Sequence, residues 1–292
     1  METLGYRPNQ AARALASAKT KMLGILSSDT DFTGPASMVH EMEVAARAKG
    51  YFAVSCGIDP TSSESVQGGI DHLMNLGVEG LAIVTPYPDA VEYVRTRVTS
   101  IPVVSLDSMY RMDELAVSVD NFAGAVAATE YLIELGHRNI VHISGPKNWF
   151  ETATRSAGYT STMLNKRLEP QIIEGDWEIE TGFNIGMSLD IDSRKITALF
   201  VANDRMALGV QNAMRKRNVD IPNRLSVIGF DDLPESKFYF PSLTTVRQDF
   251  KQLGERAMNL LLQELEGKTF KKMDRLIPQL IVRESTTVVP KL

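Results

Sequence analysis

From Met22 onward, short apolar runs alternate with longer stretches in which apolar residues recur at helical spacing. The short runs predict buried strands at 22–28, 51–56, 81–85 and 103–106. The stretches between them predict helices near 36–49, 63–76 and 89–97, the first of which stops at Gly50. Strands that alternate with helices in this way form a parallel sheet with helices on both faces. The chain is therefore predicted to be an α/β protein.

A second series of the same kind begins after Asp120. It predicts strands at 140–143, 171–174, 198–202 and 225–230, and helices at 123–135, 154–165, 180–189 and 205–216. Two doubly wound units of similar size predict two lobes with a cleft between them. A third segment, with a helix at 249–266 and a strand at 280–282, is too short for a domain and is expected to cross back between the lobes.

Composition limits the class of protein. The chain has 292 residues, a net charge of -5 and 43% hydrophobic residues, as expected for a globular chain that, taken whole, is not a nucleic-acid binder. Cys56 is the only cysteine, so neither an intrachain disulfide nor a cysteine-ligated metal site can form. The sequence contains no run of about 18 apolar residues that could span a membrane. We expect the protein to be cytoplasmic.

The charge is unevenly distributed. The first 21 residues carry Arg7, Arg13, Lys19 and Lys21 against Glu2, a net +3, while the rest of the chain carries -8. The Ala-rich stretch 10–16 has good helix propensity but is too short to be stable alone. Composition therefore favours a frayed, solvated N-terminal arm, while a small basic segment of this kind could still bind nucleic acid.

Enzyme signatures are missing. Gly68–Gly69 does not follow a strand at the spacing of a phosphate-binding loop, and there is no Gly-x-Ser-x-Gly elbow. The four histidines include no pair at a helical metal spacing. His137, which follows Gly136 at a predicted helix end, is expected to act as a C-terminal capping cation.

Carboxylates follow several predicted strands, where ligands bind in open α/β sheets. They are Asp29, Asp31, Asp107, Asp204, Asp231 and Asp232. Such acids could act as general acid and base, cation ligands, acceptors for a polyhydroxylated ligand, or helix caps. Trp177, in a turn-like stretch, and Phe250, near the predicted crossing, favour a carbohydrate, because an aromatic face covers the C–H side of a sugar.

Several sequence blocks resemble the LacI/GalR-type transcriptional regulators. They are Leu4-Gly5-Tyr6-Arg7-Pro8-Asn9 with Ala12-Arg13-Ala14-Leu15, Glu134 to Ile140, Ser144-Gly145-Pro146, Arg155 to Tyr159, Ala202-Asn203-Asp204, Val227 to Asp232, and Pro241 to Phe250. These blocks occur in order over nearly the whole chain. The Trp177 and Gln248–Phe250 blocks are most similar to the lactose-repressor branch of the family.

The resemblance implies a two-lobed effector-binding core of the periplasmic-binding-protein type. By motif position, Arg155 would donate to ligand hydroxyls and Asp231 would accept from them, with Asn203 at the next strand end. The first lobe would contribute Ser28, Phe32 and Asp107. Trp177 and Phe250 would stack against a sugar.

The resemblance also gives the basic arm a role. Residues 9–16 resemble the family's hinge helix, so Asn9, Arg13 and Leu15 would contact DNA, with Leu15 wedged into the minor groove. The family begins with a helix-turn-helix, which this chain lacks, and no heptad tail follows Pro290. A dimer is therefore expected, and the chain as it stands should lack sequence-specific DNA binding.

The sequence thus predicts the effector-binding and dimerisation core of a regulator that senses a mono- or disaccharide and changes its affinity for operator DNA. No cofactor, metal or enzymatic activity is expected. The predicted parts are a remnant of the DNA-binding head and hinge at 1–20, an N-terminal lobe at 21–119 plus 247–276, and a C-terminal lobe at 120–246 plus 277–292. Induction and corepression both stay open, and the alternatives are a transporter's sugar-binding protein and a sugar-acting hydrolase.

Overall fold

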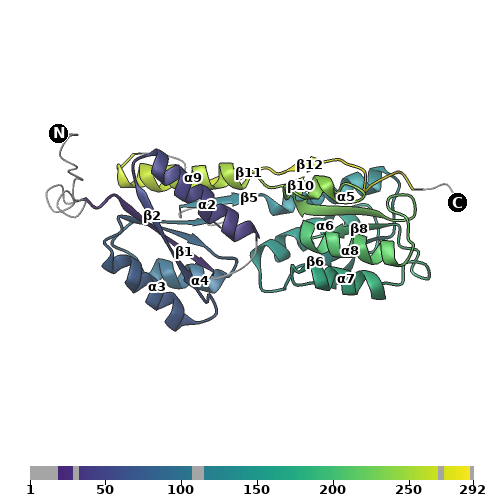
Figure 1. Ribbon diagram of the computed structural model, residues 1–292, viewed down its shortest axis with the longest axis horizontal. Coiled ribbons are helices and arrows are strands. Elements are labelled where there is room, and N and C mark those ends of the chain that lie inside the picture. The colour runs from purple at the N-terminus through teal and green to yellow at the C-terminus, as the bar shows by residue number, and fades with distance from the viewer. Residues whose placement is uncertain (1–18, 29–32, 107–114, 269–272, 290–292) are drawn as a thin grey trace, which may run out of the picture. The chain divides into compact units, whose positions relative to one another are not determined.

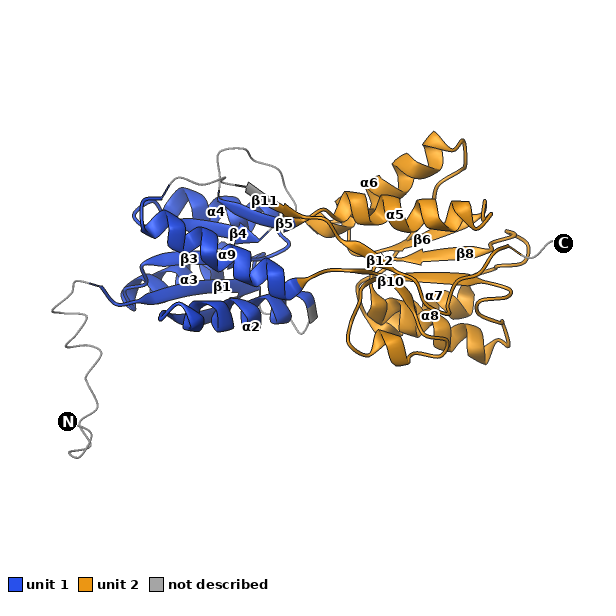
Figure 2. Ribbon diagram, turned by 90° about the horizontal axis from the view of Figure 1, so that it is seen from above, with its two compact units in different colours: residues 1–118, 250–274 blue, residues 119–249, 275–292 orange. Residues whose placement is uncertain are grey.

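The computed structural model describes residues 19–28, 33–106, 115–268 and 273–289. The chain divides into two compact units, unit 1 with residues 1–118 and 250–274 and unit 2 with residues 119–249 and 275–292 (Figure 2). Each unit is built around its own six-stranded sheet. The chain therefore leaves the first unit, completes most of the second, and returns to the first before it ends in the second.

The sheet of unit 1 has the strand order β11-β5-β4-β3-β1-β2. Its strands are β1 (Met22–Ser28), β2 (Phe52–Ile58), β3 (Gly80–Val84), β4 (Val103–Leu106), β5 (Ala116–Val119) and β11 (Met273–Leu276). The helices are α2 (Thr33–Ala48), α3 (Ser63–Asn75), α4 (Pro88–Arg97) and α9 (Phe250–Leu265). Figure 1 shows α2 with α9 on one face of this sheet and α3 with α4 on the other.

The sheet of unit 2 has the order β12-β10-β9-β8-β6-β7, parallel except for β12. Its strands are β6 (Ile140–Ser144), β7 (Gln171–Glu174), β8 (Ala198–Val201), β9 (Ser226–Asp231), β10 (Thr244–Arg247) and β12 (Gln279–Ile281). Helices α5 (Asn121–Glu134) and α6 (Phe150–Asn165) cover one face, and α7 (Ile179–Ser188) and α8 (Asp204–Lys216) cover the other (Figure 2). A short 3-10 helix, η2 (Ser236–Phe238), lies between β9 and β10.

The packing explains the apolar pattern of the sequence. The central strands of unit 2 are buried on both faces, and Phe200 and Phe230 are fully buried in a core that α5 and α6 complete. On the other face α7 and α8 cross so closely that a Cβ at Gly209 would lie 2.0 Å from the Ile179 carbonyl oxygen. Only glycine permits that approach.

The predicted α/β class is confirmed, and three strands were missed by the prediction. β5 and β11 are four residues each, and β10 begins Thr-Thr, so none presents the continuous apolar run used to find strands. Helix α6 also begins at Phe150 rather than near residue 154.

The expectation that His137 is a capping cation is wrong. The imidazole is buried, with Nδ1 2.9 Å from Thr197 Oγ1 and Nε2 3.0 Å from the Thr287 carbonyl oxygen. Burial lowers the pKa of His137, which favours the neutral ring. The residue ties the C-terminal segment to the sheet instead.

In the part of the chain that the structure describes, no helix is long and apolar enough to cross a membrane.

Candidate functional site

Four of the predicted site residues come from one edge of the unit 2 sheet. Asp231 ends β9, Asn203 follows β8 directly before α8, and Trp177 follows β7. Arg155 lies on α6, the helix that follows β6. The carboxyl ends of parallel strands meet at one edge of a sheet, so these connections bring the four residues together.

Arg155 is held in one position. Its residue is 3% exposed, and its Nε donates to Asn121 Oδ1 at 2.8 Å while Nη1 donates to the Ala202 carbonyl oxygen at 2.5 Å. The guanidinium also lies 3.8 Å from the centre of the Phe230 ring. Burial lowers the pKa of Arg155, and the charge of Asp231 opposes that shift. An arginine remains charged in such a setting, so the site carries a fixed buried cation.

Asp231 faces that cation across a gap. Its Oδ1 lies 3.8 Å from Arg155 Nη2, beyond hydrogen-bond distance, and accepts from Gln248 Nε2 at 2.6 Å. Burial raises the pKa of Asp231 to about 6, although Arg155 and Gln248 both act to lower it. The backbone φ of Asp231 is +114°, a conformation that costs a non-glycine residue energy and is often found at functional sites.

Trp177 forms an aromatic surface beside this pair. The residue is 4% exposed, and its ring lies against the backbone of Gly145, where an added Cβ would be 2.1 Å from Cζ2. The Trp149 ring is 5.4 Å away at an interplanar angle of 54°. The Arg155 guanidinium lies 5.5 Å from the Trp177 ring. The indole Nε1 is buried and has no hydrogen-bond partner among the described residues, so an acceptor from a ligand would satisfy it.

Both the oxygen and the nitrogen of the Asn203 side-chain amide form hydrogen bonds within the protein. Its Oδ1 accepts from the backbone N–H of Met206 at 2.8 Å and so caps α8. Its Nδ2 donates to the Trp177 carbonyl oxygen at 3.0 Å. Asn203 therefore holds the Trp177 turn, which has a φ of +76°, against the start of α8.

Asp204 is fully buried directly after Asn203. It accepts from the Leu233 backbone N–H at 2.9 Å and from the hydroxyls of Ser236 and Thr245 at 2.5 Å each. Burial, and then the charge of Asp231, raises the pKa of Asp204 to about 7. These three hydrogen bonds all join Asp204 to β10 and the β9–β10 connection. Asp204 therefore stabilises the local fold at the carboxyl edge of the sheet.

The residues predicted in the first lobe are placed as follows. Ser28 ends β1 and donates to Thr85 Oγ1 at 2.8 Å. Phe250 begins α9 in unit 1, and a Cβ added at Gly34 would be 3.8 Å from its ring. Phe32 and Asp107 lie outside the described residues, as do Asn9, Arg13 and Leu15 of the predicted hinge.

The chain is similar to known proteins over almost its full length. Residues 129–286 match the periplasmic binding protein-like domain. The lactose operon repressor of Escherichia coli (strain K12) is 30% identical over 99% of this chain and 81% of that protein. The chain belongs to the LacI family of transcriptional regulators.

Two further comparisons support the family. The PurR repressor of Haemophilus influenzae (strain ATCC 51907 / DSM 11121 / KW20 / Rd) is 31% identical over 98% of this chain and 87% of that protein. A crystal structure of a lac repressor dimer bound to operator and the anti-inducer ONPF has a TM-score of 0.89 and 28% identity, and covers 97% of this chain and 100% of that chain.

The chain is therefore the effector-binding core of a LacI-family regulator, with the periplasmic-binding-protein-like fold that the sequence predicts. Members of this family are regulators and not enzymes, so the prediction of no enzymatic activity is confirmed and the hydrolase alternative is wrong.

Sequence reasoning missed three residues that contact this candidate site. Trp149 lies beside Trp177, Asn121 fixes Arg155, and Gln248 fixes Asp231. The chain has only two tryptophans, and Trp149 follows the Ser144-Gly145-Pro146 block by three residues, which is the one signal that could have drawn attention to it. Among the described residues, no group of three or more His, Cys, Asp or Glu could hold a metal ion.

Proposed function

We propose that this core binds a sugar or glycoside at the carboxyl edge of the unit 2 sheet, and that the bound effector changes the affinity of the full regulator for operator DNA. The observation that carries the proposal is the pair of buried Arg155 and partly exposed Asp231, whose facing atoms are 3.8 Å apart. The pair therefore leaves a donor and an acceptor available side by side.

A hydroxyl group has the chemistry to use both. It can accept from Arg155 Nη2 and donate to a carboxylate oxygen of Asp231, and vicinal hydroxyls of a sugar present several such groups on one ring. Because Arg155 is fixed by Asn121 and Ala202, and Asp231 by Gln248, the ligand would not have to order these side chains. Preorganisation of this kind improves affinity.

The aromatic residues suit the apolar part of the same ligand. Trp177 and Trp149 meet at an angle and provide ring surface beside the polar pair, while Trp177 Nε1 offers a buried donor. A sugar ring has hydroxyls at its edge and C–H groups on its faces, so it uses both kinds of surface. Asn203 is proposed as a further polar contact, and Ser28, Phe32, Asp107 and Phe250 are proposed as additional contacts on the strength of the sequence resemblance.

A homodimer is the proposed working form, as in the lac repressor dimer bound to operator. In support, unit 2 exposes large apolar side chains on two segments that flank α8. These are Ile179 and Met187 on α7, Phe238 at the end of η2, and Phe240 just after it, of which the last two are 78% and 86% exposed. Exposed apolar patches of this kind mark association surfaces.

Operator DNA is the second proposed partner. The proposed hinge residues that contact it are Asn9, Arg13 and Leu15. A regulator that binds operator DNA is proposed to act in the cytoplasm. An effector that binds one conformation of the regulator more tightly changes the affinity of the regulator for DNA. By linkage, bound DNA changes the affinity for the effector by the same factor.

The two tryptophans allow a direct test, since both lie at the proposed site. We would titrate the protein with mono- and disaccharides, nucleosides and purines, following tryptophan emission and thermal stability together. A saccharide should change both signals. Asp231→Asn, which keeps the side-chain volume, should weaken that saccharide at least about tenfold, the loss expected for one hydrogen bond to a charged group.

Arg194→Ala is the matched control, because Arg194 is an exposed arginine of unit 2 that bonds to Gln171. It should bind the saccharide like the parent protein. A purine that binds while all saccharides fail would overturn the sugar assignment but keep the site. Unchanged saccharide binding by Asp231→Asn would remove the Arg155–Asp231 pair from the site.

A further inference from the structure

Asp232, which follows Asp231 in the chain, connects three neighbouring strands of the unit 2 sheet. Its Oδ2 accepts from Arg247 Nε at 2.6 Å, and its Oδ1 accepts from Arg283 Nη2 at 2.5 Å. β9 ends at Asp231, β10 ends at Arg247, and Arg283 follows β12. Since β12, β10 and β9 are adjacent in the sheet, one carboxylate connects all three.

The Asp232 carboxylate is held at both oxygens in a largely buried position. Its side chain is 6% exposed and that of Arg283 is 16% exposed. Arg283 is itself fixed, because its Nη1 donates to the Leu243 carbonyl oxygen at 2.7 Å. Isolated exposed ion pairs contribute little, but charge-assisted hydrogen bonds that form a network around a buried carboxylate hold its members in one geometry. Arg247, although half-exposed, is therefore anchored at its Nε.

Gln248, the neighbour of Arg247, is the residue that fixes Asp231. Its Nε2 donates to Asp231 Oδ1 at 2.6 Å, and its backbone N–H donates to the Asp231 carbonyl oxygen at 3.2 Å. Unit 2 ends one residue later, at Asp249, where the chain continues into α9 of unit 1. Gln248 thus lies where β10 has ended and the chain is about to leave unit 2, and the adjacent side-chain anchor to unit 2 is the bond between Arg247 and Asp232.

The backbone of the two acids fits this double attachment. The φ angle is +114° at Asp231 and +57° at Asp232, a region that residues other than glycine seldom adopt. Strained backbone of this kind persists only where surrounding contacts maintain it, and the bonds from Arg247 and Gln248 are such contacts.

We infer that Asp232 is a positioning residue of the effector site, an inference that rests on the proposed function. Its bond to Arg247 keeps Gln248 in place. Gln248 in turn holds the Asp231 carboxylate in the geometry that a ligand would meet. Asp232 itself touches no ligand in this arrangement and acts only through its neighbours.

The test measures the pKa of Asp231 in the ligand-free chain, by NMR of protein labelled with ¹³C at the aspartate carboxyl groups. The resonance of Asp231 is the one that Asp231→Asn removes. Gln248 lowers this pKa, so Gln248→Met should raise it by at least about one pH unit, which corresponds to one hydrogen bond to a charged group. The other charges that act on Asp231, those of Arg155 on α6 and Asp204 on α8, are the same in all proteins compared.

Asp232→Asn should change the same pKa in two ways. Loss of the negative charge lowers the pKa of Asp231, whereas release of Gln248 raises it. Only the second effect needs Gln248, so we would introduce Asp232→Asn both into the parent chain and into Gln248→Met. The change in pKa should be more positive in the parent chain by at least about one pH unit. A residue that acted by charge alone would give the same change in both backgrounds.

Arg247→Met is the second variant, since it breaks the same link at its half-exposed side. Its effect on the pKa of Asp231 should also be more positive in the parent chain than in Gln248→Met. Asp192→Asn is the matched control, because Asp192 pairs with Arg224 at 2.6 Å elsewhere on unit 2. It should give equal changes in the two backgrounds.

Equal changes in the two backgrounds for Asp232→Asn and Arg247→Met would overturn the inference. If Asp232→Asn cannot be purified folded, Arg247→Met decides the question alone. Failure of the sugar assignment would appear in the saccharide titrations and not in this measurement, because no ligand is present in it.

Discussion

The two ends of the unit 2 sheet use arginine in opposite ways. At the carboxyl edge Arg155 is 3% exposed and bonded to Asn121 and Ala202, whereas at the amino edge Arg215 is exposed and has no partner within the described chain. A buried, bonded cation cannot adapt, so the site proposed at the carboxyl edge would select ligands that fit Arg155. A free cation on a flexible stem can change position, so Arg215 restrains the amino edge of the sheet far less than Arg155 restrains the carboxyl edge.

The largest expected difference between the two ends is in stability. Arg155→Met leaves buried Asn121 and partly exposed Asp231 without their cationic partner. Breaking such a pair costs about 3 kcal/mol, the lower end of the range for buried pairs. Arg215→Met removes an exposed side chain and should change the free energy of unfolding by less than about 0.5 kcal/mol. Denaturant unfolding of both variants measures the contrast.

Equal losses in the two variants would contradict the comparison, because they would show that Arg155 contributes nothing beyond its exposed counterpart. If Arg155→Met cannot be purified folded, Asn121→Ala gives a milder version of the same test. It removes one hydrogen bond to the guanidinium, worth about 1.5–3 kcal/mol.

The carboxyl edge should also be sensitive to pH through Asp204. Its pKa is raised from the ordinary value near 3.8 to about 7, so the folded state binds this proton more tightly than the unfolded state. Its contribution to the free energy of unfolding should therefore be highest near pH 4 and fall by roughly 2–4 kcal/mol as the pH rises to about 7. The difference in unfolding free energy between parent and Asp204→Asn, measured across that range, isolates this contribution.

Ser236→Ala provides the control for Asp204. The Ser236 hydroxyl donates to the carboxylate and lowers its pKa, so its removal should extend the loss of stability to higher pH. A difference curve that is flat between pH 4 and 7 would show that Asp204 is not held in this environment.

Effector binding should depend on pH through Asp231, whose pKa is raised to about 6. If the carboxylate accepts from the ligand, affinity should be constant above pH 7 and fall by up to about tenfold per unit below pH 6. The same titrations with Asp231→Asn should show no such fall. An equal fall in the Asp231→Asn titrations would show that another group causes the pH dependence.

The grouping of candidate residues at the carboxyl edge of the unit 2 sheet could be predicted from the sequence, because the sequence motifs lie at the ends of predicted parallel strands. Asp231 and Asn203 each stand at the end of an apolar run, and parallel strands bring such positions to one edge. The partners that fix Arg155 and Asp231 were not predictable in the same way. The hydrogen bond between Asn121 and Arg155 spans 34 residues of sequence, and that between Gln248 and Asp231 spans 17. Nothing in the local sequence of Asn121 or Gln248 signals the pairing.

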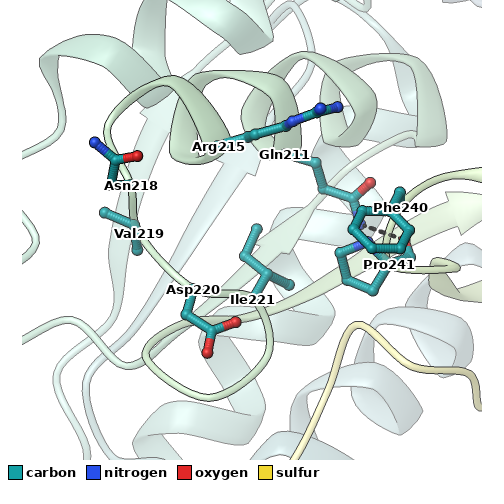
Figure 3. Close-up of a pocket in the computed structure, with 8 residues that line it drawn as sticks. All are labelled: Gln211, Arg215, Asn218, Val219, Asp220, Ile221, Phe240 and Pro241. Carbon is teal, nitrogen blue, oxygen red and sulfur yellow. Dashed lines mark hydrogen bonds between the residues drawn. The ribbon is translucent and has the colours of Figure 1, made fainter.

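The contact of Gln211 with Pro241 at the opposite, amino edge of the unit 2 sheet (Figure 3) was not predicted at all, for a related reason. Its two residues belong to the second half of a helix and to a connection, and each alone resembles an ordinary surface position. Gln211 differs from a solvated glutamine only because the chain folds Pro241 against it, and its unsatisfied oxygen is a property of that tertiary contact.

The smallest predicted effect concerns how the carboxyl edge is held in shape. Asn203→Ala removes the cap of α8 and should cost about 1 kcal/mol, like the loss of other N-caps. It also releases the Trp177 carbonyl oxygen, so the positive φ of Trp177 loses a restraint and the spacing of the two tryptophans should change. We therefore expect altered tryptophan emission and weaker saccharide binding together with the modest loss of stability.

Ser62→Ala is the matched control, since Ser62 caps α3 in unit 1 by the same kind of bond, to the Ser65 N–H at 3.2 Å, and has no link to a tryptophan. It should cost a similar free energy and leave emission and saccharide binding as they are. Were Asn203→Ala to behave identically to Ser62→Ala, Asn203 would be a cap and nothing more. The rigidity of the carboxyl edge would then have to come from Arg155, Asp204 and Asp232.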